Sequence, residues 1–517
     1  MCDYKATYYD YEKENWVSYK CTLEPSKPRC MFHDGSSYKS RPDDVRNEFY
    51  KMVDDAIQNN QPLYCIGFNL PDITVNGIKF VKPVYFSNAK FQQQADFSYA
   101  TFQQADFSGA KFQQVDFSRT TFHQQAYFSG STFQQANFSR AIFQQVDFSR
   151  AIFQQANFLG STFQQAYFSS AKFQQANFSF AIFQQQVDFS GATFQQANFS
   201  SAIFQQAYFS RTTFHQQANF LGATFHQQAN FSSAKFQQAN FSSAIFHQQV
   251  DFSGATFHQQ VDFSGSTFQQ ANFSFADFIG EVEFINTTFP NEDRTNKHIP
   301  IRFDYSTFRS RVRFIGKSDK PLDLSNVSFK GVDLDKVEFH NVKWREDKVL
   351  WFIKRNIVAD ELFMDELKNY QEVSRIYNQL RKNYEMHLHF TEASHFFIGE
   401  MEAIRRSLWS KGIGGKLASI PYLLYKYIAL YGENVLLPLV LWTPIIIAGF
   451  AVWRILVSNC YDPQCMIDRV IDSIAAYFQV PRSTLQPTAQ DIIERILAIP
   501  ILGSAFIALR RRFERRK

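Results

Sequence analysis

Four residues near the N-terminus have side chains that could bind one zinc ion together: Cys2, Cys21, Cys30 and His33. Two residues separate Cys30 from His33, a spacing typical of metal ligands, and thiolate sulfur with imidazole nitrogen suits zinc. Four protein ligands leave no open coordination position, so such a site would be structural rather than catalytic. The alternative is a set of unpaired thiols beside a loop histidine, and the long separation between Cys2 and Cys21 favours it.

A second pair of cysteines, Cys460 and Cys465, lies near the other end of the chain. They could form a disulfide if the segment around them faces an oxidising compartment, and two free thiols are the alternative. Six cysteines in 517 residues are too few for a disulfide scaffold. Nucleotide-binding loops, catalytic triads and metalloprotease motifs are absent from the sequence, so we expect no enzymatic activity.

A repeat of five residues dominates the part of the chain that lies between these two groups of cysteines. From about residue 73 to 344, a typical unit reads Ala-Asn-Phe-Ser-x-Ala-x-Phe-Gln-Gln, and the chain contains 60 phenylalanines. A period of five fits neither an α-helix nor a flat strand. It fits a coil with four short sides, each pointing one large and one small residue inward. Some steps between phenylalanines are six residues long, all on the Gln-rich sides, and we interpret each as a one-residue β-bulge.

The pattern resembles that of the pentapeptide-repeat family, in which Ala-(Asp/Asn)-(Leu/Phe)-x-x recurs. The resemblance implies a mainly β fold, a right-handed quadrilateral β-helix with about twenty residues per coil and coils about 4.8 Å apart. Phenylalanines would then stack on one another along four inner corners. Residues 291–299 interrupt the repeat and are expected to form a loop. N-terminal strings of the Cys…Cys…Cys-x-Phe-His type accompany some proteins of this kind, which supports the zinc interpretation.

The segment after the repeat is predicted to form two helices. Residues 365–388 have the pattern of an amphipathic helix, and a second helix is expected to begin with Thr391 as its N-cap. We interpret Glu400 and Glu402 of the second helix as surface charges without a catalytic role. Strings of this kind resemble a segment of pentapeptide-repeat proteins that carry a C-terminal membrane domain.

Two apolar runs near the C-terminus are candidate membrane spans. Residues 435–453 include no charged side chain, and this length is close to the roughly 20 residues that cross a bilayer. The second run, 492–509, is weaker because Glu494 and Arg495 lie near its start. A buried helix or an interfacial anchor is its alternative interpretation.

The charges around these runs favour a hairpin with both chain ends in the cytoplasm. Basic residues precede the first run and follow the second, whereas the loop 458–490 has few of them. The N-terminus lacks the apolar segment of a signal peptide, which predicts the same location. Residues 422–431 are expected to lie along the inner surface of the membrane.

Two spans around a short amphipathic segment, 467–480, also resemble the pore domain of a potassium channel. A potassium filter needs glycines whose backbone can turn carbonyl groups toward the ion. No glycine occurs between Gly449 and Gly503. The sequence therefore argues against a selective potassium pore, while a degenerate or differently selective pore stays an alternative.

The sequence as a whole predicts a non-enzymatic protein of the cell membrane with two spans, whose β-helix is a cytoplasmic scaffold or interaction surface. The alternative is an ion-channel-like or transport-related protein with the β-helix as its regulatory domain. A near-neutral surface rich in Gln and Ser is a poor mimic of a phosphate backbone, so no nucleic-acid partner is expected. Exposed Phe180, Phe275 and Leu221 indicate contacts with an unidentified protein or with a second copy in a homo-oligomer.

Four regions are expected on these grounds. They are an N-terminal Cys/His-containing domain (1–70), the β-helix (71–344), a helical hairpin (345–415) and a membrane domain (416–517) with spans at about 435–457 and 491–510.

Overall fold

The computed structural model describes residues 3–10, 13, 15–22, 30–290, 299–350, 353–362, 369–480 and 488–514. It divides into two compact units, Met1–Lys343 and Trp344–Lys517. The insertion predicted to be a loop lies almost entirely outside the described residues, as does Cys2.

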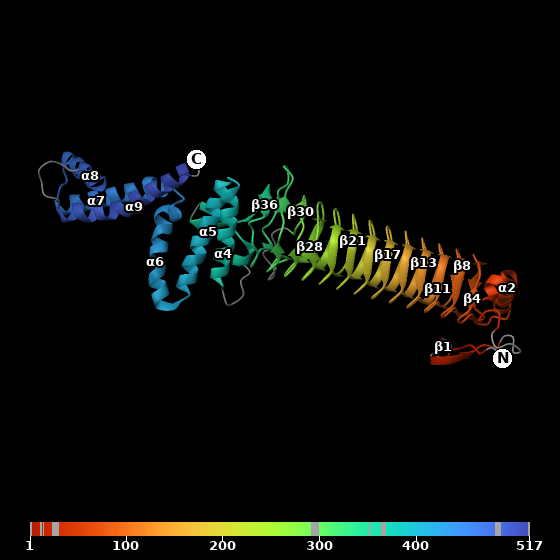
Figure 1. Cartoon of the computed structure of the whole chain (residues 1–517). Helices are drawn as coiled ribbons and strands as arrows, with labels where there is room; N and C mark the ends of the chain where they lie inside the picture. The colour runs from red at the N-terminus through yellow and green to blue at the C-terminus, as the bar shows by residue number, and fades with distance from the viewer. Residues whose placement is uncertain are drawn as a thin grey trace. The chain divides into compact units, whose positions relative to one another are not determined.

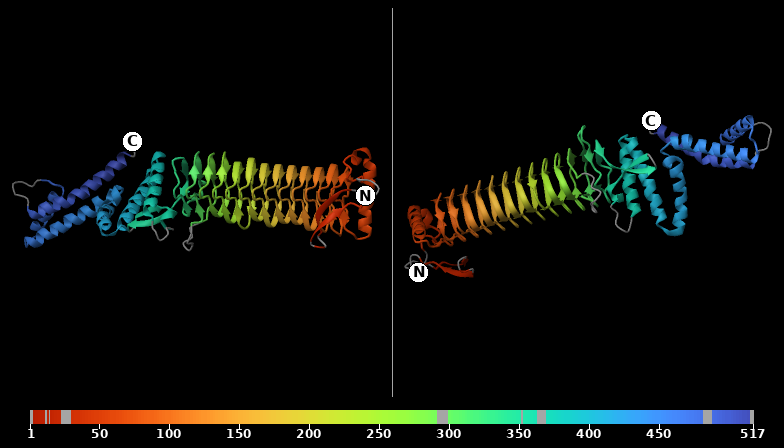
Figure 2. Two further views of the ribbon diagram at one scale, coloured as in Figure 1. Left: turned by 60° about the horizontal axis from the view of Figure 1, so that its bottom comes forward. Right: turned by 180° about the vertical axis from the view of Figure 1, so that it is seen from behind.

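The first unit is a parallel β-solenoid of about 13 turns over residues 63–343, which confirms the predicted fold class. Its coils follow one another as rungs in Figures 1 and 2. Between Phe86 and Phe289 each coil places four phenylalanines inside, and these rings stack on their equivalents one coil away. Phe138 and Phe158, for example, have ring centroids 4.9 Å apart and planes 3° apart. Alanine and valine alternate with these rings at buried positions, so the walls can close around them.

Two long parallel ladders hold the coils together through backbone hydrogen bonds. The first ladder and its side pairings consist of β3 (Leu63–Tyr64), β6 (Lys79–Phe80), β7 (Val84–Tyr85), β9 (Thr101–Phe102), β10 (Ala105–Asp106), β12 (Thr121–Tyr127), β14 (Ile142–Asp147), β16 (Thr162–Tyr167), β18 (Ile182–Asp188), β20 (Ile203–Tyr208), β22 (Thr224–Phe225), β23 (Ala229–Asn230), β25 (Ile245–Asp251), β28 (Thr267–Asn272), β31 (Ile301–Arg302) and β35 (Val327–Ser328).

The second ladder consists of β4 (Asn69–Leu70), β5 (Ile73–Thr74), β8 (Lys90–Asp96), β11 (Lys111–Asp116), β13 (Thr132–Asn137), β15 (Ile152–Asn157), β17 (Lys172–Asn177), β19 (Thr193–Asn198), β21 (Thr213–Asn219), β24 (Lys235–Asn240), β26 (Thr256–Phe257), β27 (Val261–Asp262), β29 (Asp277–Phe278), β30 (Val282–Ile285), β32 (Thr307–Phe308), β33 (Val312–Ile315) and β36 (Val337–His340). A short pair, β34 (Leu322–Asp323) and β37 (Val342–Lys343), follows at the end of the solenoid.

The six-residue steps behave as predicted in most coils. In β12 the register shifts after Phe122 and pairing resumes at Gln125 with Gln145, so the next phenylalanine stays in phase. The same shift occurs in β8, β18, β21 and β25. The steps after Phe225 and Phe257 instead interrupt the strand, leaving short strands on either side of the extra residue. An extra residue therefore disturbs the outer wall without displacing the inner rings.

A small N-terminal region covers the first coils. It contains an antiparallel hairpin of β1 (Lys5–Asp10) and β2 (Asn15–Lys20), the short α1 (Ser37–Ser40) and α2 (Pro42–Gln58). Phe49 of α2 contacts Phe86, and Tyr8 of β1 packs against Ile66 and Tyr85. These contacts cover apolar groups that stacking would otherwise leave exposed at the terminal coil of a solenoid.

The second unit begins with a β-hairpin rather than with the predicted helix. Strands β38 (Arg345–Leu350) and β39 (Ile353–Ile357) pair antiparallel, and β39 begins and ends with a β-branched isoleucine. The helices that follow are α3 (Ala359–Leu362), α4 (Tyr370–Met386), α5 (Phe390–Trp409), α6 (Gly412–Ala429), a single 3-10 turn (Leu430–Gly432), a π-helical turn (Leu437–Trp442), α7 (Thr443–Val457), α8 (Pro463–Tyr477) and α9 (Ala489–Glu514). Two helix starts differ from the prediction. Helix α4 begins after Asn369 rather than at residue 365, and the N-cap of α5 is His389 rather than Thr391.

The expectation that Glu400 and Glu402 are surface charges is wrong, because both side chains are buried. Glu402 receives hydrogen bonds from Arg405 and from the Tyr431 hydroxyl (2.9 Å) and pairs with Lys426 (3.4 Å). Burial alone would raise the pKa of Glu402, but these donors and cations lower it to about 2. The carboxylate thus joins α5, α6 and the turn after α6, a role that helix periodicity could not indicate.

Candidate functional site

The structure brings three of the four predicted zinc ligands together. Cys21 directly follows β2, and Cys30 and His33 lie in the turn that precedes α1. One ligand atom from each of the three lies within 4.8 Å of the others, and all three residues are buried. Cys2 lies outside the described residues.

The orientation of His33 suits metal binding. Its Nε2 lies 2.9 Å from the carbonyl oxygen of Ile66, which can only accept, so Nε2 carries the hydrogen. Nδ1 therefore presents its lone pair, 3.1 Å from Sγ of Cys30. The ring of Tyr4 stacks on the imidazole with centroids 3.9 Å apart and limits its rotation. A backbone acceptor on the distal nitrogen is the usual outer-shell partner of a metal-binding histidine.

The two thiols also have the spacing of shared ligands. Their sulfur atoms lie 3.6 Å apart, and burial raises the pKa of Cys30 to about 12. A zinc ion would supply the positive charge that two buried thiolates need. The donor set of two sulfurs and one imidazole nitrogen, with Cys2 available in the sequence as a fourth, fits a closed structural zinc site.

Replacement of Cys30 by serine is expected to remove zinc from the chain. The unchanged protein should contain about one zinc ion per chain, as a closed four-ligand site binds one. Metal analysis by mass spectrometry after dialysis checks this, with Cys65→Ala as the matched control because Cys65 is buried but lies outside the cluster. Zinc loss in the Cys65 variant but not in a Cys2→Ser variant would assign the fourth ligand to Cys65.

A second group of imidazoles lies on the solenoid. His226 and His247 stack on successive coils with centroids 5.3 Å apart. Both side chains are exposed. Two exposed ligands do not complete a metal site, so we interpret both histidines as exposed residues of the β-bulges.

Two described helices of the second unit are long and apolar enough to cross a membrane, Leu437–Val457 and Ala489–Arg511. Only 17% and 33% of their most apolar stretches are buried. The core helix of a water-soluble protein would be mostly buried, whereas most of the apolar residues in these two helices are exposed. Pro438 lies in the first turn of the π-helical segment that precedes α7, where a helix needs no N–H, and its carbonyl accepts hydrogen bonds from the backbone N–H and the hydroxyl (2.9 Å) of Thr443.

A largely buried ion-pair cluster joins the two apolar helices. Arg454 of α7 contacts Asp491 (2.6 Å) and Glu494 (2.8 Å), both on α9. Ser473 of α8 hydrogen-bonds Glu494 and the carbonyl of Ile447 (2.9 Å). Sequence reasoning took Glu494 as evidence against the second span, but the structure gives this carboxylate a partner. The sequence contained a sign of this pair. Arg454 stands at the end of the first apolar run and Glu494 near the start of the second, and these two positions lie side by side when the runs form an antiparallel hairpin.

The second cysteine pair lies between α7 and α8. Cys460 and Cys465 are joined as a disulfide, with Cα atoms 6.0 Å apart. Asp462 between them caps α8 by accepting from the backbone N–H groups of Gln464 and Cys465. Helix α8 then contacts both α7 and α9. A channel filter would lie at residues 477–483, of which the structure describes 477–480.

Comparison with known proteins agrees with the repeat. Residues 76–121, 107–152, 148–193, 181–224 and 220–267 match the family described as "Pentapeptide repeats (9 copies)". Residues 76–267 of the β-solenoid therefore consist of repeats of the pentapeptide-repeat family. No curated protein matches the chain, and no enzyme family is indicated.

Two solved structures show similarity over the solenoid. HetL, a pentapeptide repeat protein involved in heterocyst differentiation regulation from the cyanobacterium Nostoc sp., is 17% identical, with 51% of this chain and 88% of HetL covered and a TM-score of 0.21. Full-length QnrB1, a plasmid-mediated fluoroquinolone resistance protein, is 19% identical, with 52% of this chain and 92% of QnrB1 covered and a TM-score of 0.12. At this similarity neither protein's role transfers to this chain.

Proposed function

We propose that this protein is a non-enzymatic membrane protein in which the α7–α9 hairpin anchors the β-solenoid at the cytoplasmic face as an interaction surface. The observation that carries the proposal is the inverted character of the hairpin, with apolar side chains outward and Arg454, Asp491 and Glu494 inward. In a bilayer, ionisable residues pair inside and apolar residues face lipid. Basic residues on both flanks favour cytoplasmic termini, and the disulfide then faces the oxidising side.

Aromatic residues at left-handed corners of the solenoid support an interaction surface. Phe275 and Tyr305 adopt φ values of +59° and +56°, their side chains are exposed, and their rings stack 5.5 Å apart. Glycine occupies the same corner one coil earlier, at Gly254. Because a left-handed conformation costs a bulky residue free energy, an exposed aromatic pair there fits a binding role better than a folding role.

The full chain is expected to remain in membranes after extraction with sodium carbonate at pH 11, whereas a chain ending at Gly432 should be released. The apolar runs of α7 and α9 supply the difference, since peripheral contacts do not survive this treatment while a spanning hairpin does. Immunoblots of the pellet and supernatant check the result, and tags at both termini test sidedness by protease protection. Complete release of the full chain would contradict anchoring.

The interaction surface needs its own experiment. Photo-crosslinking in native membranes should capture a protein partner, and the double variant Phe275→Ser/Tyr305→Ser should lose it. Serine is the matched replacement because Ser233 and Ser243 occupy corners of this kind in nearby coils. Unchanged capture by the variant would assign the partner to another surface.

A channel-like role is a second candidate, and the placement of α8 favours it. This helix returns between the two spans and exposes Ile467, Val470 and Ile471. A pore would need several copies around a shared polar path. Ion flux in liposomes holding the purified full chain tests it, and absence of flux from a protein that is monomeric in detergent would remove it.

A further inference from the structure

Helix α6 has an apolar stripe that no described residue of its unit covers. Ile413, Leu417, Ile420, Leu424 and Tyr427 follow one another at steps of four and three residues, the spacing of one helix face. All five are exposed, up to 81% for Ile413 and 62% for Leu417. A stripe of this length on a water-exposed helix would be unfavourable, so it calls for an apolar surface to rest on.

The charge around the stripe has one sign. Between Glu402 and Glu433 the sequence includes no acidic residue, while Arg405, Arg406, Lys411, Lys416 and Lys426 are basic. Lys411 and Lys416 are exposed at the start of α6, and Lys416 lies over the ring of Trp409 at 5.7 Å. An apolar face flanked by exposed lysines and aromatic rings is typical of helices that lie in a membrane interface.

The opposite face of α6 is fixed within its unit. Lys426 pairs with Glu402 of α5, and Ser419 is buried. At its C-terminal end, the carbonyl of Tyr427 accepts a hydrogen bond from Trp442 at the start of the first span (2.8 Å). The stripe therefore points away from α5. In Figure 1, α6 runs crosswise to α7 and α9 and lies on the same side of α5 as these two helices.

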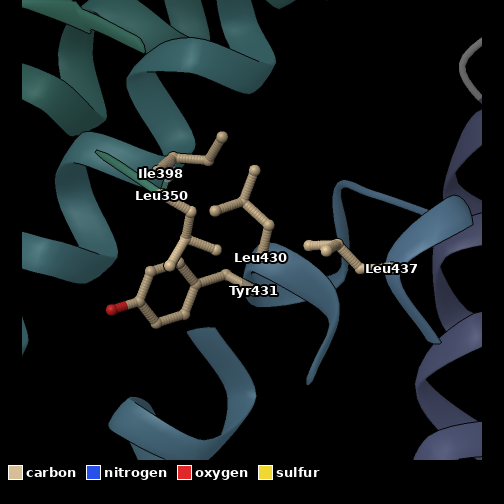
Figure 3. Close-up of a cluster of buried hydrophobic side chains, with 5 residues drawn as sticks. All are labelled: Leu350, Ile398, Leu430, Tyr431 and Leu437. Carbon is tan, nitrogen blue, oxygen red and sulfur yellow. The ribbon is translucent and has the colours of Figure 1, made fainter. Parts of the chain in front are cut away.

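A well-packed turn between α6 and the first apolar helix sets the crosswise direction of α6. Leu430, Tyr431 and Gly432 have consecutive positive φ values of 50°, 58° and 81°, which is unusual for two large residues. Figure 3 shows how Leu430 and Tyr431 pack with Leu350, Ile398 and Leu437, and this burial offsets the backbone strain. The chain thus leaves α6 and enters the first span through a packed, left-handed corner rather than a flexible linker.

We propose that α6 lies in the plane of the cytoplasmic leaflet, with its apolar stripe among the lipid chains and its lysines on anionic headgroups. The inference rests on the proposed membrane anchoring and adds a second, lipid-selective contact to it. It also moves the start of the interfacial segment from the expected residue 422 to Gly412. The hairpin would anchor the chain, and α6 would set its preference for negatively charged membranes.

Site-specific fluorescence in proteoliposomes of the full chain tests the proposal. Single cysteines at Leu417 on the stripe, at Ala418 and at Val440 in the first span receive an environment-sensitive maleimide, with the parent chain labelled in parallel as background. Ala418 is the matched control because it is exposed but lies about 100° around the helix from Leu417. The vesicles contain phosphatidylcholine with or without phosphatidylglycerol, plus a lipid that carries a nitroxide quencher near the headgroup.

Quenching at Leu417 is expected to be about threefold greater than at Ala418 in vesicles with phosphatidylglycerol, and to fall toward the Ala418 level without it. Equal quenching at Leu417 and Ala418, with Val440 still quenched, would overturn the role of α6 while leaving the anchor intact. No quenching at either Leu417 or Val440 would instead overturn the anchor. Pyrene labels at Leu417 that form excimers between copies would assign the stripe to a second copy of the chain.

Discussion

Hydrogen exchange in the coils around residue 178 is expected to accelerate by about a hundredfold or more when Phe178 is replaced by alanine. Phe178 is fully buried and stacks on Phe158 (4.6 Å) and Phe199 (5.0 Å). Its edge also meets Phe168 and Phe189 at 5.5 Å. Removing a ring of this kind leaves a cavity that costs about 3–5 kcal/mol, because the stacked rings on either side cannot move inward. Mass spectrometry of the deuterated full chain in detergent measures the change.

Phe180 supplies the control for this prediction, only two residues away. Its side chain is 61% exposed, and its φ is +56° at a corner where Gly160 and Gly222 occur in other coils. Phe180→Gly removes backbone strain but also frees the unfolded chain, so local stability should change by no more than about 1 kcal/mol. Comparable acceleration in both variants would mean that ring position inside the coil does not control stability, which would contradict the stacked core.

Replacement of Arg454 by methionine is expected to lower the stability of the membrane hairpin by about 3–5 kcal/mol. The substitution leaves the buried Glu494 and the partly buried Asp491 without their cation, and an uncompensated buried charge is costly in a low-dielectric surrounding. The triple variant Arg454→Met/Asp491→Asn/Glu494→Gln should recover most of the loss, since no unpaired charge remains. Thermal unfolding in detergent, followed by the fluorescence of a C-terminal reporter, measures both variants.

The exposed pair Arg510–Glu514 on the same helix is the matched control. Its atoms are as close as those of the buried pair, at 2.7 Å, but both side chains are mostly exposed. Surface pairs gain little because water already solvates both charges, so Arg510→Met should not change the unfolding temperature measurably. A single Arg454 variant as stable as the parent would show that the hairpin does not bury its charges.

Several features of this protein follow from its sequence alone, for a local physical reason. A period of five carries every Phe to the inside of a coil with five-residue sides, so a solenoid, the stacking of its rings and the phase of most bulges could be predicted, although the solenoid begins at residue 63 rather than at the predicted 71. The apolar runs likewise appear in the sequence, because the ability to span a membrane depends on length and charge within one segment. The proximity of Cys30 and His33 required only their short spacing.

Other features were decided only by contacts between residues far apart in the chain. The pairing of Arg454 with Glu494, the burial of Glu402 and the hydrogen bond from His33 to Ile66 join residues 40, 29 and 33 positions apart. The exposed stripe of α6 belongs with them, since exposure depends on which neighbours fail to cover a face. A repeat specifies its own packing at every step, whereas the meeting of two distant side chains depends on how the elements between them are folded, and only the tertiary structure determines that.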